Sequence, residues 1–126
     1  GLENEVAMLG FLSDVEPLMN VMDVQVNCSF GTEATSLALL EGMSLGKPAV
    51  VTDFGGNPGV IQNGVNGFLT PTHDAETLAK DLEILFCDED LYKRMSAECR
   101  RIYKEKFTAD VNAGNIENVY MAVLNK

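Results

Sequence analysis

The chain has 126 residues, of which 46% are hydrophobic and 22% are charged, and its formal net charge is −10. This length and composition predict a single folded domain and exclude a disordered chain. Residues 1–79 contain ten acidic side chains and one basic side chain, so the clustered Lys and Arg that nucleic-acid binding requires are absent.

The first predicted elements are two short strands with a helix between them. Val6–Phe11 and Val24–Cys28 are apolar runs of strand length. Ser13 or Asp14 is suited to cap a helix that runs to about Met22. The order strand, helix, strand is typical of a parallel α/β unit.

The alternation continues through the middle of the chain. A helix rich in Leu is predicted to end at Gly46, and Pro48–Thr52 follows as a third strand. Its apolar residues do not alternate with polar ones, as expected of a parallel strand covered on both faces. Pro58 can begin a short helix after a Gly-Gly-Asn-Pro loop, and Gly64–Thr70 reads as a turn and a last strand.

Residues 73–126 are predicted to be helical, because apolar residues recur there at helical spacing. The three stripes are Leu78, Leu82, Leu85 and Phe86; Tyr92, Met95, Cys99, Ile102 and Tyr103; and Ile116, Val119, Tyr120, Val123 and Leu124. The fold class is therefore α/β: a Rossmann-like open parallel sheet of about four strands, with helices on both faces and a C-terminal helical segment. Residues 1–72 form the alternating part and residues 73–126 the helical part of one domain, 1–126.

No apolar run approaches the roughly 18 residues of a transmembrane helix, and the N-terminus lacks the features of a signal peptide. Cys28, Cys87 and Cys99 are odd in number and not at metal-ligand spacing. They predict reduced thiols in a cytoplasmic protein, with no metal and no cofactor.

Two glutamates eight positions apart are the strongest functional signal. Glu33 lies where a helix should begin, and Glu41 lies roughly 12 Å further along that helix at 1.5 Å per residue. Carboxylates at this separation can accept hydrogen bonds from two sets of sugar hydroxyls, while free N–H groups at the helix start can hold a phosphate. Glu41 stands among apolar residues, so we expect a buried carboxylate that needs a functional reason. The pattern indicates a nucleotide-sugar site.

Other residues with chemical potential carry weaker signals. The Gly55-Gly56 pair fits either a plain turn or close approach of the backbone to a ligand. Asp53 follows a strand, but the acidic partners of a phosphate-accepting receiver domain are missing. His73 precedes a predicted helix and reads as a loop histidine. No dinucleotide, Walker, nucleophile-elbow or zinc motif is present.

Taken together, Glu33 to Glu41, the Gly-Met-Ser-Leu-Gly-Lys-Pro segment, the Gly-Gly-Asn-Pro loop and the Asn-Gly-Val-Asn-Gly-Phe-Leu segment resemble a known family. It is the C-terminal, donor-binding domain of GT-B-fold retaining glycosyltransferases of group 1, also called family 4. The resemblance covers nearly the whole chain. It implies that Glu33 contacts the transferred sugar and that Glu41 binds the ribose of a nucleoside diphosphate sugar.

The resemblance also implies which backbone groups surround the donor. The implied donor-binding residues are Glu33, Ala34, Thr35, Ser36, Leu37, Glu41, Phe11, Leu12, Gly55 and Gly56. Backbone amides around Ser36 and Leu37 would hold the diphosphate or the sugar, and the loop around Phe11 and Leu12 would lie near the base. The chain departs from the family pattern where Ala34, Thr35 and Ser36 replace Gly-Phe-Gly, and where Gly59 replaces a common Glu.

The family's enzymes have two Rossmann-like domains, so the resemblance implies that this chain is a fragment without its acceptor domain and without catalytic residues of its own. Alone it is expected to be inactive, with possible self-association through its C-terminal helix. Two other functions remain open: a non-catalytic nucleotide-sugar-binding or interaction domain, and a nucleotide-sugar epimerase on the same fold.

Overall fold

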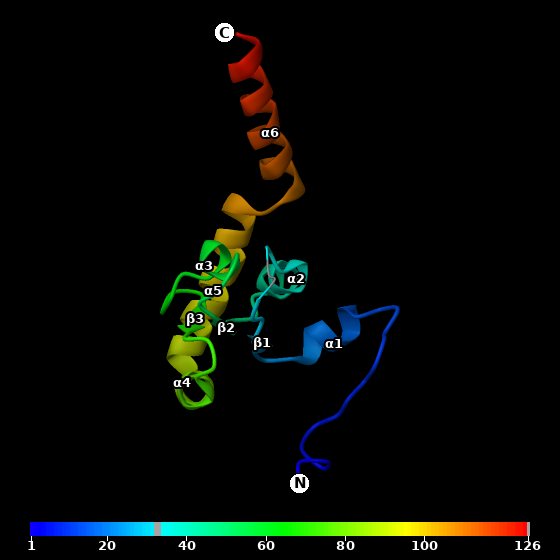
Figure 1. Ribbon diagram of the computed structural model, residues 1–126, viewed down its shortest axis with the longest axis vertical. Coiled ribbons are helices and arrows are strands. Elements are labelled where there is room, and N and C mark those ends of the chain that lie inside the picture. Colours follow the sequence, from blue (N-terminus) through cyan, green and yellow to red (C-terminus); the bar gives the residue numbers. More distant parts are fainter. Residues whose placement is uncertain (32–33, 126) are drawn as a thin grey trace.

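The computed structural model describes residues 1–31 and 34–125, whose strands form a three-stranded parallel sheet (Figure 1). The strands, β1 (Gln25–Asn27), β2 (Ala49–Thr52) and β3 (Gly67–Thr70), stand side by side in chain order. The helices are α1 (Glu16–Val21), α2 (Leu37–Ser44), α3 (Asn57–Val60), α4 (Ala75–Cys87), α5 (Glu89–Lys106) and α6 (Ala109–Leu124). The expected α/β class with an open parallel sheet is confirmed.

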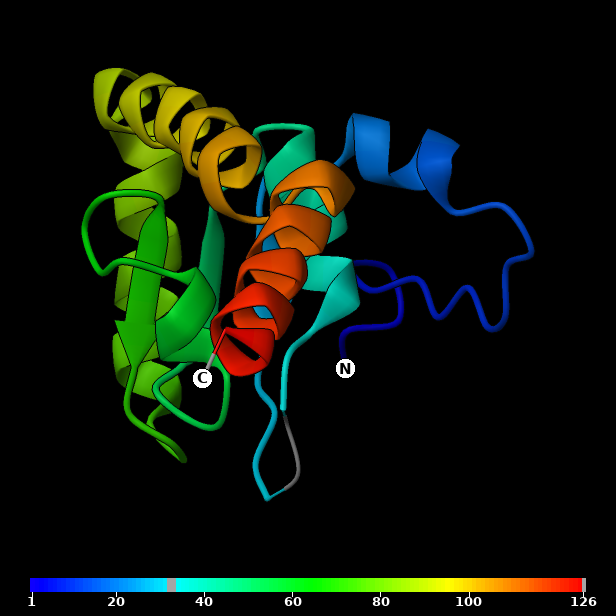
Figure 2. The same ribbon diagram turned by 90° about the horizontal axis from the view of Figure 1, so that it is seen from above.

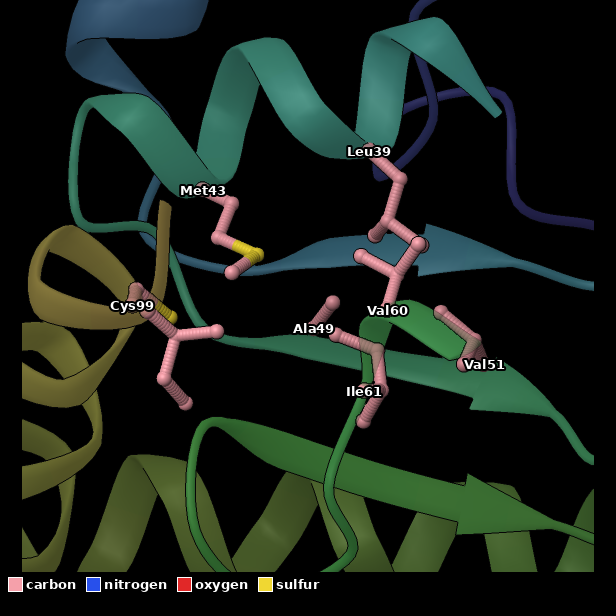
Figure 3. Close-up of a cluster of buried hydrophobic side chains, with 8 residues drawn as sticks. Leu39, Met43, Ala49, Val51, Val60, Ile61 and Cys99 are labelled. Carbon is pink, nitrogen blue, oxygen red and sulfur yellow. The ribbon is translucent and has the colours of Figure 1, made fainter. Parts of the chain in front are cut away.

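Strand β2 lies at the centre of the sheet and is buried along its whole length, which explains its apolar sequence. Successive side chains of a strand point to opposite faces. Ala49 and Val51 pack against side chains of α2, α3 and α5, as Figure 3 shows, whereas Val50 packs with Leu85 of α4. Helices therefore cover both faces of the sheet, as predicted.

The predicted strand at Val6–Phe11 is wrong. These residues form no strand, and the side chains of Met8 and Phe11 are 91% and 93% exposed. A strand requires a neighbour for its ladder of hydrogen bonds, and within the described residues no other strand pairs with this run. Apolar composition alone does not supply that neighbour, so three strands form instead of about four.

Helix α5 closes the amino edge of the sheet. Tyr92 Oη donates to the Asp23 carbonyl just before β1, at 3.0 Å. Cys99 Sγ donates to the carbonyls of Lys47, at 3.5 Å, and Asn66, at 3.2 Å, which precede β2 and β3. Helix α5 thus contacts the residues before all three strands, at the edge of the sheet opposite the loops that follow the strands.

Burial raises the pKa of the Cys99 thiol to about 12. Because the thiol holds its proton more tightly in the folded than in the unfolded chain, its contribution to stability is complete below pH ~9 and is lost as the pH rises toward ~12. We expect the free energy of unfolding of the wild type to fall relative to that of Cys99→Ser over this range, measured by urea titration. A constant difference between the two proteins would contradict this prediction.

The helical stripes are borne out to different degrees. In α5, Met95, Cys99 and Ile102 are buried, as expected. In α4, Leu85 is buried but Phe86 is 66% exposed, because at 100° per residue it lies about 80° around the helix from Leu78.

Helix α6 has no buried residue, and Figure 1 shows it projecting from the body of the molecule. Its apolar stripe is exposed, from Ile116 at 47% to Leu124 at 78%. Within the described part of the chain, no helix is long and apolar enough to cross a membrane.

Candidate functional site

The loops that follow the strands meet at the carboxyl edge of the sheet. The Thr52 hydroxyl, at the end of β2, donates to the Ser29 carbonyl in the loop after β1, at 2.7 Å. The Asn57 side-chain amide donates to the Thr52 carbonyl at 2.9 Å, which ties the start of α3 to the same point. Both Thr52 and Asn57 are buried, so these bonds fix the relative positions of the two loops.

Gly56 brings the loop after β2 against the segment that precedes α2. A Cβ atom at position 56 would lie only 1.7 Å from the Ala34 carbonyl oxygen. Gly56 is therefore required for a close approach to the chain's own backbone, and its predicted approach to a ligand stays a prediction. Gly55 has φ 58°, which favours glycine for a different reason.

The amino terminus of α2 opens toward the same edge. Ser36 caps the helix, its hydroxyl accepting from the Leu39 N–H at 3.3 Å, and its carbonyl accepts from the Leu40 N–H. The N–H groups of Leu37 and Ala38 find no acceptor among the described residues and are the donors that an anion would use.

Glu33 lies outside the described residues. The expectation that one helix joins it to Glu41 is wrong, because α2 begins at Leu37 after the cap of Ser36, whose backbone is extended. A rise of 1.5 Å per residue therefore does not apply to the whole interval between the two glutamates.

Glu41 is exposed, which corrects the expectation of a buried carboxylate. Leu39 and Met43, two positions before and after it, are buried against the sheet. Two residues correspond to about 200° around a helix, so burying these neighbours turns Glu41 outward. The apolar residues around it in the sequence lie mostly on the other face.

Two hollows flank Glu41. One, of about 480 Å³, lies between α2, the end of α5 and the start of α6, and the other, of about 350 Å³, lies between α2 and α1. Lys106 and Asn112 line the first together with Glu41. Sequence reasoning missed both residues; the only signal was that the basic residues concentrate in the second part of the chain.

Not all of the other predicted donor-binding residues lie at the carboxyl edge of the sheet. Ala34 and Thr35 are exposed near Gly56, and Leu37 is exposed at the hollow that contains Glu41. Phe11 and Leu12 belong to the extended segment before α1, which Figures 1 and 2 both show lying apart from the ends of β2 and β3. The roles proposed for these two residues stay predictions.

Two features bear on what the edge can bind. The Asn57 Oδ1 atom is buried and has no hydrogen-bond partner within the described residues. The Thr77 hydroxyl and, to a smaller extent, the Thr77 N–H donate hydrogen bonds to the Asp74 carboxylate and hold its pKa below its usual value. A carboxylate therefore caps α4 at this edge.

In residues 1–31 and 34–125, no group of three or more His, Cys, Asp or Glu is placed to hold a metal ion.

Comparison with known proteins places this arrangement in a family. Residues 1–102 match the family described as glycosyl transferases group 1. The N-acetyl-alpha-D-glucosaminyl L-malate synthase of Bacillus anthracis is 32% identical over 123 residues, which are 98% of this chain and 32% of that protein. The chain thus spans about a third of this relative's length.

Solved structures agree. The chain matches the Anabaena protein HepE in complex with UDP, with a TM-score of 0.87 and 29% identity, over 95% of this chain and 33% of that one. The same protein is also known with UDP-glucose. The fold matches the C-terminal domain of a group 1 glycosyl transferase from Francisella tularensis, with a TM-score of 0.70 and 23% identity, over 80% of this chain and 53% of that one. The chain belongs to the group 1 glycosyltransferases and has the fold of their GT-B C-terminal domain.

Proposed function

We propose that this chain is the donor-binding part of a retaining glycosyltransferase, which transfers a sugar from a nucleoside diphosphate sugar to an acceptor hydroxyl. The observation that carries the proposal is the exposed Glu41 on α2, the helix whose first N–H groups lie at the carboxyl edge and find no acceptor in the described part of the chain. This fold also occurs in a relative solved with UDP and with UDP-glucose.

Each part of the edge has a role in this proposal. Glu41 binds the ribose, because an exposed carboxylate beside a hollow can accept hydrogen bonds from two neighbouring hydroxyls. The N–H groups of Leu37 and Ala38 lie at the positive end of α2 and suit a diphosphate. Glu33, which the sequence places just before this terminus, orients the transferred sugar.

The charge balance of the chain bears on where the reaction occurs. Lys47 is the only basic residue among residues 1–79. Its ammonium group donates to the Asn20 carbonyl at 2.9 Å and so already has a partner. Lys106 is the one basic side chain that lines the hollow of Glu41 in the described part of the chain, and a diphosphate carries more than one negative charge. Neutralising the departing diphosphate therefore requires further groups besides Lys106. We place them, with the acceptor-binding domain, in the part of the protein beyond this chain.

Helix α6 supplies the surface for that part. The first turn of α6 borders the hollow that contains Glu41, since Ala109 and Asn112 line it, and the exposed apolar residues follow further along the same helix. We propose that the acceptor domain covers this helix in the whole enzyme. In the isolated chain, the same face is the expected site of self-association.

Binding of nucleotides and nucleotide sugars by the full-length protein tests the proposal. We expect calorimetry to show that Glu33→Ala and Glu41→Ala each weaken binding of the preferred donor about 10- to 100-fold, as the loss of charge-assisted hydrogen bonds predicts. Glu83→Ala is the matched control, because Glu83 is an exposed glutamate on α4. Its affinity should equal that of the wild type.

Three outcomes would contradict the proposal. If the full-length protein binds none of UDP, GDP, ADP and their sugars, the chain has no donor site. If Glu41→Ala binds as the wild type does, α2 does not hold the nucleotide. If the isolated 126-residue chain turns over a donor in the presence of an acceptor, the catalytic groups lie within it.

A further inference from the structure

One aromatic ring from each of the three carboxyl-edge loops lies in a single cluster, which we call the edge cluster: Phe30, Phe54 and His73. They follow β1, β2 and β3 respectively by two or three residues. The Phe30 and His73 ring centroids are 4.3 Å apart in a T-shaped arrangement, and those of Phe30 and Phe54 are 6.3 Å apart. Rings at these separations attract one another edge to face or tilted.

The backbone of His73 has an independent peculiarity. Its φ of 62° is positive, and among the described residues no other residue except glycine has a positive φ. Glycine would adopt this conformation more cheaply, although His is among the side chains that tolerate it best. The contact that the ring makes with Phe30 is the visible gain from having a side chain there.

Phe30 belongs to a segment that is fastened on both sides. Before it, the Ser29 carbonyl accepts from the Thr52 hydroxyl at 2.7 Å. After it, Ala34 abuts Gly56, where no Cβ atom fits. The edge cluster adds a third attachment, from β3, that neither of these contacts provides. Residues 29–31 and 34–36, the described residues that lead into the N–H groups of α2, thus have contacts with all three strand ends.

We propose that Phe30 and His73 are positioning residues for the donor: through their ring contact they hold the part of the loop after β1 around Phe30, and with it the start of α2, in the geometry that binds the donor. The inference rests on the proposed function. Neither ring is required to touch the donor. Phe30 is 66% exposed, so its ring adds little to the buried core and its main effect is on the segment that carries it.

Two substitutions in the full-length protein test this role. Phe30→Ala removes the central ring. His73→Gly removes its partner while relieving the positive φ, so the folded state should persist. Phe86→Ala is the matched control, because Phe86 is also 66% exposed but lies near the end of α4, roughly 16 Å along that helix from the edge. Phe30→Tyr keeps the ring and should behave as the wild type.

Donor binding is measured with UDP-glucose, UDP-galactose, UDP-N-acetylglucosamine and GDP-mannose, and the donor that binds the wild type most tightly is then used for all variants. We expect Phe30→Ala and His73→Gly to raise the Kd and KM for that donor about three- to tenfold, the range of an aromatic pair. The kcat should change less than twofold. Amide exchange at Leu39 and Leu40, whose N–H groups bond to Ser36, should accelerate in both variants and not in Phe86→Ala.

The possible failures are distinguishable. If the wild type binds no donor, the proposed function fails and the positioning role with it. If the wild type binds and Phe30→Ala matches Phe86→Ala in Kd and in amide exchange, the positioning role alone is wrong. If His73→Gly lowers the melting temperature, and its kcat falls in parallel with its affinity for the donor, the cluster serves the fold and not the donor.

Discussion

Gly56→Ala is expected to destabilise the protein by about 3 kcal/mol, the upper part of the range for overpacking. The new Cβ would lie 1.7 Å from the Ala34 carbonyl oxygen and 2.7 Å from its carbon. Both are backbone atoms, so no side chain can rotate away, and either the loop after β2 or the segment before α2 must move. Urea unfolding followed by circular dichroism measures the change.

Gly59→Ala is the control for this prediction. Gly59 lies in α3, three residues further on, and apart from its chain neighbours and the backbone of its own helix no described atom lies within 4 Å of the position that a Cβ would take. Because alanine restricts the unfolded chain and fits a helix better, we expect this variant to be slightly stabilised, by about 0.5 kcal/mol. Equal stability of the two variants would show that the approach of Gly56 to Ala34 is not as close as described.

Asn57→Asp is the second substitution with a large expected effect, a loss of about 3–5 kcal/mol near neutral pH. Asn57 is fully buried, and its Nδ2 atom donates to the Thr52 carbonyl at 2.9 Å and the Thr52 hydroxyl oxygen at 3.4 Å. A carboxylate has no proton to donate to that carbonyl, and its charge would be buried without a cation. Thr52 in turn holds Ser29, so the loop after β1 should loosen as well.

The pH dependence separates the charge from the lost hydrogen bond. Burial raises the pKa of an introduced carboxyl in the folded state above its unfolded value of about 4. The deficit of Asn57→Asp should therefore shrink as the pH falls through the raised folded pKa, and its charge contribution should vanish below pH ~4, where the group is neutral in both states. Asn57→Ala should lose about 2 kcal/mol at every pH. A deficit of Asn57→Asp that does not depend on pH would mean that the site is accessible to water.

The sequence predicted most of the helices and strands because their local signals agreed with the packing. The unbroken apolar run of β2 and the α5 stripe of Met95, Cys99 and Ile102 both mark surfaces that are buried. The wrongly predicted strand has a different cause. Val6–Phe11 has the composition of a strand, but whether it becomes one depends on a neighbouring strand, and within the described residues it has none.

The candidate site could be predicted only in part. The Gly-Gly-Asn-Pro loop does follow a strand, β2, as predicted, since parallel strands bring their carboxyl ends to one edge. The loop after β3, which carries His73, was not predicted to belong to the site. The exposure of Glu41 was not predicted, because the apolar residues next to it in the sequence lie mostly on the other face of the helix. Lys106 reaches the hollow of Glu41 from 65 positions further along the chain, and no local pattern connects the two residues.

What the sequence determined by itself was the class of fold and the family, because both depend on periodicity and on short motifs that are read within about 30 residues. Only the tertiary structure decided which groups meet at the carboxyl edge. It brings Gly56 to Ala34 and His73 to Phe30, pairs that lie on different loops. Their distances depend on how the sheet aligns its strands and how α5 holds their beginnings, and alignment of this kind arises only when distant segments pack together.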